Sequence, residues 1–340
     1  MSDESTWRPD VLGPGFEQLT LPLGTDAEGE VVATLVRALP QQPHLLDRLL
    51  GKQPPLADVD VLYVHGWSDY FFQKRLASFW TSRGARFFAL DLRKYGRSLR
   101  PGQTPGYITD LRTYDEDIAA ALTAMGRDAT SSRRLVLVGH STGGLTLSLW
   151  AARNPGVVSA VILNSPWLEF QLSAATRAAI TPMVGLGATL RPLAVAPQVD
   201  LGFYSRAQTE TREPDDVETN LQWRPELTMA VHAGWLNAVI TGHAQVAAGL
   251  SVDAPVLVLL SARSAIPSRW SDELTRADTV LVVDDIARAA LKLGPSVSVE
   301  RIDGAIHDVF LSRHDAREHA YDRLAWWVDG LIARRVPVRR

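Results

Sequence analysis

Apolar stretches alternate with stretches of helical periodicity along most of this chain. The apolar stretches lack alternating polar positions, which is typical of strands buried on both faces of a parallel sheet. The pattern therefore predicts an α/β fold with a mostly parallel central sheet flanked by helices. The predicted strands are Asp60–Val64, Ala85–Leu92, Arg134–Val138, Val157–Leu163, Pro255–Leu260 and Ser296–Ile302. The predicted helices are Phe72–Arg83, Leu111–Met125, Thr142–Arg153, Asp284–Leu293 and His314–Arg334.

The N-terminal part has a different pattern, with glycine and proline between short apolar runs. Phe16–Leu23 and Val31–Leu39 are predicted to pair as antiparallel strands around a turn at Asp26–Gly29. A short helix is predicted at Leu45–Leu50, within a proline-rich connection.

The alternation of strands and helices stops after Pro166. Several helical stretches follow, broken by prolines, and the best formed is Thr228–Ala248. The simplest organisation is one sheet interrupted by a helical cap. We therefore predict a core in two parts, residues 1–166 and 251–340, with a cap or lid at residues 167–250.

Composition narrows the possible functions. The 340 residues carry a formal net charge of -3, with both signs interspersed, so no nucleic-acid footprint is indicated. The chain has no cysteine, which excludes disulfides, thiolate metal sites and a cysteine nucleophile. It shows no phosphate-binding loop and no metal-binding histidine motif, so we expect neither cofactor nor metal. It shows no signal peptide or membrane-spanning run, and we expect a cytoplasmic protein.

The sharpest motif is Gly-His-Ser-Thr-Gly at residues 139–143. It follows a predicted strand and opens a predicted helix, as a nucleophile elbow requires. Such a turn exposes the serine hydroxyl, and its tight geometry needs glycine where a Cβ would clash. The helix N-terminus also favours negative charge that develops on a substrate. Ser141 is therefore the predicted nucleophile.

An acyl-transferring serine needs two backbone N–H groups directed at the oxyanion. One is expected from the residue after the nucleophile, here Thr142. The other is expected from a loop after an upstream strand, where His65-Gly66-Trp67 follows Asp60–Val64. We predict the Trp67 N–H as the second donor, with Gly66 allowing close backbone approach.

His307 is the predicted general base. It lies in a glycine-containing loop between the last strand and the last helix, which gives the chain order serine, acid, histidine. The other histidines lie in the proline-rich connection (His44), in tight turns (His65, His140), in the predicted cap (His232, His243) and in the last helix (His314, His319).

The acid is less directly indicated. An aspartate is expected directly after the strand Pro255–Leu260, but no carboxylate stands there. Asp278 is our prediction, with residues 264–277 as an extra loop. Asp272, Glu273 and Glu169 remain alternatives.

Four segments together resemble the α/β-hydrolase superfamily, and within it the monoglyceride lipase and lysophospholipase-like group with a serine aminopeptidase S33-type domain. The departures are Lys94, where that group usually has glycine, and the missing carboxylate after Pro255–Leu260. The resemblance implies a carboxylesterase or lipase-like activity on acyl esters, under a lid-like cap, and does not imply peptidase activity. The segments are Leu62–Trp67, Ala89–Ser98, Val138–Gly144 and Gly304–Asp308.

The sequence thus predicts a serine hydrolase that cleaves carboxylic esters of a small-molecule or lipid-like substrate. Alternatives with the same triad are cleavage of a thioester, an amide or a carbon–carbon bond, and acyl transfer to an alcohol. A non-catalytic alternative is a binding protein on this fold. The cap is expected to supply an apolar acyl pocket from Trp167, Phe170, Trp223 and Trp235.

Overall fold

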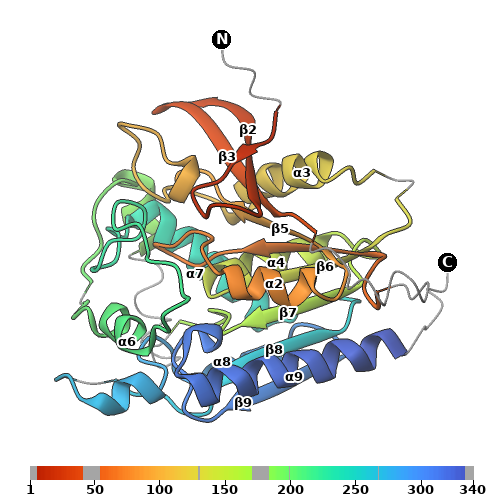
Figure 1. Ribbon diagram of the computed structural model, residues 1–340. Coiled ribbons are helices and arrows are strands. Elements are labelled where there is room, and N and C mark those ends of the chain that lie inside the picture. The colour runs from red at the N-terminus through yellow and green to blue at the C-terminus, as the bar shows by residue number, and fades with distance from the viewer. Residues whose placement is uncertain are drawn as a thin grey trace.

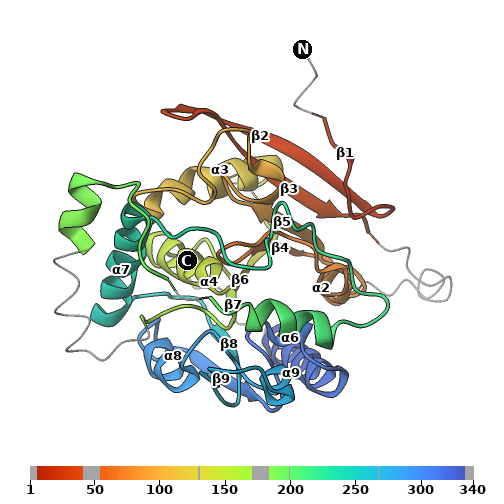
Figure 2. The same ribbon diagram turned by 90° about the vertical axis from the view of Figure 1, so that its left-hand side faces the viewer.

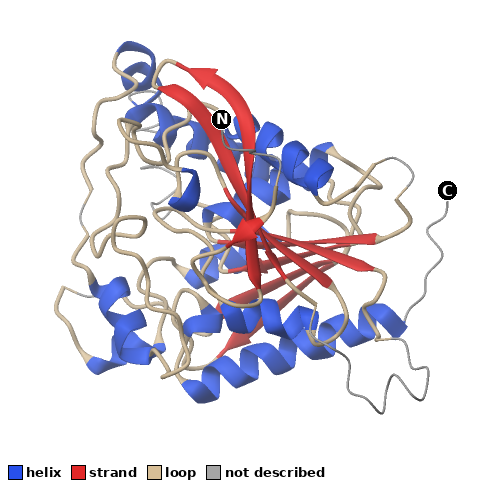
Figure 3. Cartoon of the chain, turned by 45° about the horizontal axis from the view of Figure 1, so that its top comes forward, coloured by secondary structure: helices blue, strands red, loops and turns tan. Residues whose placement is uncertain are grey.

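The computed structural model describes residues 6–40, 54–128, 131–170, 184–198, 200–266 and 268–333. Its centre is a nine-stranded sheet in the order β1-β2-β3-β5-β4-β6-β7-β8-β9, whose strands fan out with a steady twist (Figure 3). Six neighbouring strands are parallel, which confirms the predicted α/β-hydrolase fold class. The predicted helix Leu45–Leu50 lies outside the described residues.

The antiparallel edge of the sheet is formed by the N-terminal strands. β2 (Phe16–Asp26) pairs with β3 (Gly29–Ala38) as predicted, and β1 (Arg8–Pro9) lies outside β2. β3 then pairs antiparallel with β5 (Arg86–Asp91). This hairpin extends the sheet on the side away from its C-terminal strands (Figure 1).

The parallel strands inside the sheet are largely buried, which explains their mostly apolar sequences, whereas the edge strand β9 is only partly buried. Along β4, Leu62 and Val64 enter one hydrophobic core while Val61 and Tyr63 enter the other. Both faces are therefore covered, as the absence of alternation predicted. The parallel strands besides β5 are β4 (Val59–Val64), β6 (Arg134–His140), β7 (Ala160–Asn164), β8 (Val256–Ser261) and β9 (Val297–Ile302).

The two cores are closed by different helices. In Figure 2 the helices α3, α4 and α8 lie on one side of the sheet, and α2 and α9 lie on the other. All five match the predicted helices closely, with ends that differ by a few residues. They are α2 (Lys74–Thr81), α3 (Tyr114–Ala124), α4 (Thr142–Arg153), α8 (Val283–Ala290) and α9 (His314–Ala333).

The segment between β7 and β8 carries α6 (Phe203–Thr211) and α7 (Ala233–Ala248). The prediction that α7 begins at Thr228 was wrong. His232 pairs with Val195 in an isolated antiparallel bridge, so the chain before the helix is extended rather than helical. Whether residues 167–250 act as a cap stays a prediction.

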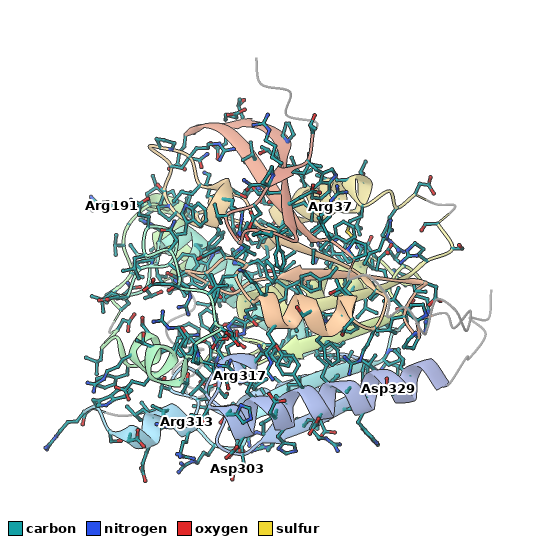
Figure 4. The ribbon with its side chains drawn as sticks, viewed as in Figure 1. Arg37, Arg191, Asp303, Arg313, Arg317 and Asp329 are labelled. Atoms are coloured by element: carbon teal, nitrogen blue, oxygen red, sulfur yellow. The ribbon has the colours of Figure 1, made fainter. Side chains whose placement is uncertain are left out.

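A buried arginine attaches the segment after α6 to the core. Arg317, 1% exposed near the start of α9 (Figure 4), binds both carboxylate oxygens of Asp216, at 2.9 and 2.8 Å. Its Nη2 also donates to the carbonyl of Thr211. A fully buried guanidinium is stable only with such partners, so this contact fixes the end of α6 beside α9.

Lys94, the departure from the family pattern, has a structural role. It adopts a left-handed backbone with φ 64°, a conformation in which glycine is unstrained. Its ammonium is buried and lies 2.6 Å from both Asp26 and Glu28, at the turn between β2 and β3. The charge pairs therefore hold the hairpin against the loop after β5.

Replacing Lys94 by methionine is expected to lower the free energy of unfolding by about 1–2 kcal/mol at neutral pH. Burial acts to raise the pKa of Asp26 and Glu28, but the hydrogen bonds and charge of Lys94, together with other local hydrogen bonds, lower both values overall. Because both pKa values are lower in the folded protein, the two carboxylates stabilise the fold at pH values above their ordinary pKa values of 3.8 and 4.5. This stabilisation is lost as the pH falls through their pKa values in the folded protein. Urea titrations should show the difference between wild type and variant shrinking from pH 7 to pH 3. A difference that stays constant with pH would contradict this role.

Candidate active site

Ser141 stands on a strained turn between β6 and α4. Its φ of 51° and ψ of -117° lie where residues other than glycine are rarely found. Its N–H donates to the carbonyl of Asn164 at 3.0 Å, and its carbonyl accepts from Trp167 N–H at 3.0 Å. The turn is therefore held from both sides, as a nucleophile elbow must be.

The glycines of the motif are required by close backbone contacts. A Cβ on Gly143 would lie 2.3 Å from the carbonyl oxygen of His65 and 2.4 Å from that of Val64. A Cβ on Gly139 would lie 2.8 Å from the Cα of Gly144. These contacts let α4 begin directly against the end of β4, which brings the elbow beside the predicted oxyanion loop.

The structure brings His307 and Asp278 together. His307 Nδ1 lies 2.9 Å from Asp278 Oδ2, and both side chains are buried. The other carboxylate oxygen, Oδ1, accepts from the N–H groups of Val280 and Leu281, at 2.7 and 2.8 Å. Because the carboxylate accepts the Nδ1 proton, Nε2 of His307 is free of that proton and can act as a base.

Asp278 reaches this place although it lies far beyond β8 in sequence. Its N–H donates to the carbonyl of Arg263 and its carbonyl accepts from Ala265, so the chain returns to the end of β8 after an extra loop. The predicted loop of residues 264–277 is thus present. Asp278 occupies the position where an acid directly after the strand was expected.

Three other carboxylates were alternatives for the acid: Asp272, Glu273 and Glu169. Asp272 is exposed on a short 3-10 helix and pairs with Arg313 at 2.7 Å. Glu273, next to it, is also exposed. Glu169 follows β7 in the segment that begins at Pro166. Among the carboxylates of the described ranges, Asp278 is the one found hydrogen-bonded to His307.

Asn164, at the end of β7, joins the turn of Ser141 to the loop of His307, and sequence reasoning missed it. Its carbonyl accepts from Ser141 N–H and faces His140 Nδ1 at 3.1 Å. Its side chain donates to Asp308 at 2.6 Å and accepts from Val309 N–H at 3.1 Å. The available signal was its place as a polar residue that ends an apolar strand, as Ser141 does.

The histidines near Ser141 other than His307 have structural environments. His140 lies with its ring centroid 5.0 Å from that of His307, which places the base beside the elbow. Burial lowers the pKa of His140 and of His65. The ring of His65 accepts from Leu92 N–H at Nε2, so Nδ1 carries the proton and donates to the carbonyl of Gly66 at 2.7 Å. A neutral His65 thus fixes the loop that follows β4.

The two predicted oxyanion donors lie on adjoining turns. A Cβ on Gly66 would come within 3.0 Å of the Ser141 Cβ, so the loop before Trp67 touches the elbow. In the part of the chain that the structure describes, neither Trp67 N–H nor Thr142 N–H donates to another group. Thr142 is the first residue of α4, where N–H groups have no partner within the helix. Both donors are therefore available to a ligand, and their catalytic role stays a prediction.

Aromatic side chains gather beside this loop. The ring centroid of Trp67 lies 3.8 Å from that of Trp235 on α7. The Trp235 centroid lies 6.1 Å from that of Trp167, and the Trp167 ring stacks on Phe170 with centroids 5.7 Å apart. Three of the four predicted pocket residues thus gather near Ser141, whose carbonyl binds Trp167. Trp223 does not join this group and packs against Tyr70 at 5.2 Å instead.

Metal-binding clusters and helices that could span a membrane are both absent from the described residues. Within the described ranges, no group of three or more His, Asp or Glu side chains is arranged to hold a metal ion. Over the same ranges, every helix falls short of the length or apolar character needed to cross a bilayer.

Comparison with known proteins gives the family of this chain. Residues 57–311 match the family model described as serine aminopeptidase, S33. The match includes β4 to β9 and every predicted site residue. This chain belongs to the serine aminopeptidase S33 family.

Curated relatives match the S33-family hydrolase over part of their length. It is 32% identical to a monoacylglycerol lipase of Mycolicibacterium smegmatis over 107 residues, which are 31% of this chain and 37% of that protein. It is 36% identical to a non-heme chloroperoxidase of Streptomyces lividans over 115 residues, which are 33% of this chain and 38% of that protein. The chain thus matches well under half of the length of either relative.

Solved structures show the same fold over most of the chain. A monoglyceride lipase of Saccharomyces cerevisiae has a TM-score of 0.61 at 15% identity, covering 92% of this chain and 96% of that one. A monoacylglycerol lipase of Paleococcus ferrophilus has a TM-score of 0.57 at 17% identity, covering 81% of this chain and 94% of that one. At these identities the likeness establishes the α/β-hydrolase fold.

Proposed function

We propose that this S33-family hydrolase is a serine esterase that cleaves carboxylic esters through an acyl-enzyme on Ser141. Family membership and the lipases among its relatives support an ester hydrolase. The observation that carries the finer proposal is the hydrogen bond between Asp278 and His307, beside the strained turn of Ser141. An imidazole fixed by a buried carboxylate, next to a strained turn that carries a serine, is the arrangement that serine hydrolases use.

In the proposed mechanism each group has one step. His307 Nε2 takes the proton from Ser141 Oγ as the oxygen attacks the ester carbonyl. The N–H groups of Trp67 and Thr142 bind the oxyanion that forms. His307 then protonates the leaving alcohol and activates a water molecule, which hydrolyses the acyl-enzyme. Asp278 fixes the tautomer of His307 and stabilises its protonated form.

The aromatic group near Ser141 suggests where the acyl chain lies. We propose that residues 167–250 form a cap, and that Trp67, Trp167 and Trp235 line an apolar acyl pocket beneath it. Apolar walls with a few polar groups are typical of small-molecule sites. A cytoplasmic location remains a prediction from the sequence.

A panel of p-nitrophenyl esters with acyl chains of rising length tests this function. The wild type should hydrolyse at least one ester with saturation kinetics, and kcat/KM should pass through a maximum that reports the size of the pocket. Enlarging the pocket by Trp235→Ala should move that maximum to longer chains. The matched control, Trp223→Ala, removes a tryptophan that packs on Tyr70 and should leave the preferred length unchanged. No turnover of any ester would favour a different scissile bond or a binding protein.

A further inference from the structure

The loop that follows the oxyanion residue Trp67 is bound to one short segment between β7 and β8. Ser68 Oγ accepts from Met229 N–H at 3.1 Å, and Tyr70 OH accepts from Asn220 N–H at 2.8 Å. Between them, Asp69 Oδ1 lies 2.8 Å from Arg224 Nε. Three consecutive residues of the loop thus hold residues 220–229, which we call the clamp segment.

The loop needs such support because it is strained. Ser68, directly after Trp67, has a φ of 54°, which costs a residue with a side chain on the order of 1 kcal/mol or more. Its side chain is 7% exposed and its hydroxyl is engaged by Met229. A strained conformation persists only where its surroundings determine it, and here the clamp segment is part of those surroundings.

The ion pair at the centre of the clamp is buried on both sides. The side chains of Asp69 and Arg224 are 6% and 12% exposed. Burial acts to raise the pKa of Asp69, and the charge of Arg224 opposes that effect. A buried pair of this kind is a poor source of stability but becomes strongly unfavourable when one partner is lost. We therefore look for a role of the Asp69–Arg224 pair other than stability.

The same arginine reaches toward His307. Arg224 Nη2 donates to Gln208 Oε1, and Gln208 Nε2 donates to Tyr204 OH at 2.6 Å. The Tyr204 ring on α6 stands edge-on to the His307 imidazole, with centroids 5.3 Å apart and planes at 80°. Arg224 is thus connected on one side to the loop of Trp67 and on the other to the ring that covers His307.

We propose that Arg224 is a positioning residue for the oxyanion hole, acting through Asp69 on the Trp67 N–H. This inference rests on the proposed serine esterase mechanism. A donor displaced by a fraction of an ångström stabilises the oxyanion less, although the substrate still enters the site. Loss of the clamp therefore reduces kcat and affinity for an oxyanion mimic, and it leaves KM nearly unchanged.

The test compares variants with an ester that the wild type turns over and with a trifluoromethyl ketone, whose adduct with serine carries an oxyanion. Arg224→Met should lower kcat about 10- to 100-fold and lower the affinity for the ketone by a similar factor. Its KM should stay within about threefold of the wild-type value. Arg224→Lys, which keeps the charge, should recover part of both. The control is Arg206→Gln, an arginine on α6 that pairs with Glu210 on the same helix and should change neither.

A second variant guards against misfolding of the first. Asp69→Ala together with Arg224→Met removes both charges, so no unpaired charge stays buried, and it should be at least as stable to urea as Arg224→Met alone. It should still bind the trifluoromethyl ketone about 10- to 100-fold more weakly than the wild type. Unchanged affinity for the ketone in the folded double variant, or a change in KM alone, would overturn the role of Arg224. A wild type that neither hydrolyses esters nor binds the ketone would instead refute the proposed function.

Discussion

Asp278→Asn is expected to lower kcat about 10,000-fold, whereas Asp272→Asn should leave it within about twofold. Asparagine cannot stabilise a protonated imidazole, and its amide favours the tautomer of His307 with Nε2 protonated, which cannot accept the serine proton. Asp272 is 73% exposed at its side chain and pairs with Arg313, so its charge is not part of the site. The measurement is kcat for one p-nitrophenyl ester across pH 6–9.

The same two variants show whether Asp278 or Asp272 is the carboxylate that supports His307. Both substitutions replace one carboxylate oxygen by an NH2 group, so they are matched in size. Asp278 Oδ1 accepts two backbone N–H bonds, and the variant's fold should be checked by its urea midpoint. Loss of activity in Asp272→Asn with retained activity in Asp278→Asn would assign the acid to the exposed loop and contradict the geometry.

Ser141→Ala is expected to reduce ester hydrolysis by at least about 10,000-fold, because no other group in the proposed mechanism can form the acyl-enzyme. The affinity for a substrate analogue should stay close to that of the wild type. Residual hydrolysis above the uncatalysed rate should come from the oxyanion donors and binding alone.

A companion variant tests the strain at the same position. Glycine tolerates the φ of 51° that serine and alanine tolerate poorly. Ser141→Gly should therefore be more stable to urea than Ser141→Ala by about 1–2 kcal/mol, while both are inactive. Equal stability of the two variants would contradict the strained elbow, and activity in either would contradict the nucleophile.

Much of the parallel sheet could be predicted because it follows from local pattern. The strand that ends at Val64 and the strand before Ser141 are apolar at most positions, and the structure buries both faces. The elbow can be recognised from its local motif, although the contacts that require Gly143 come from Val64 and His65, far away in sequence at the end of β4. Apolar runs and short motifs need only short-range information.

The rest depends on contacts between segments far apart in sequence. Asp278 could be inferred only by chain order, because a loop of unpredicted shape returns it to the end of β8. Asn164 shows only one signal, its place as a polar residue at the end of an apolar strand, and that signal does not reveal that it joins Ser141 to the loop of His307. No neighbouring residue in the sequence indicates that Arg224 is buried. Its partner Asp69 follows β4, more than 150 residues earlier in the chain. Helix α7 begins late for the same reason, since pairing with a distant residue extends the chain before it.

The central claim is that the hydroxyl of Ser141 is an activated nucleophile served by His307. A fluorophosphonate reagent followed by intact mass and peptide mapping tests it most directly. We predict a single adduct on the peptide that contains Ser141, formed slowly in His307→Ala and absent in Ser141→Ala. An unlabelled wild type, or an adduct on another residue that persists in Ser141→Ala, would contradict the account.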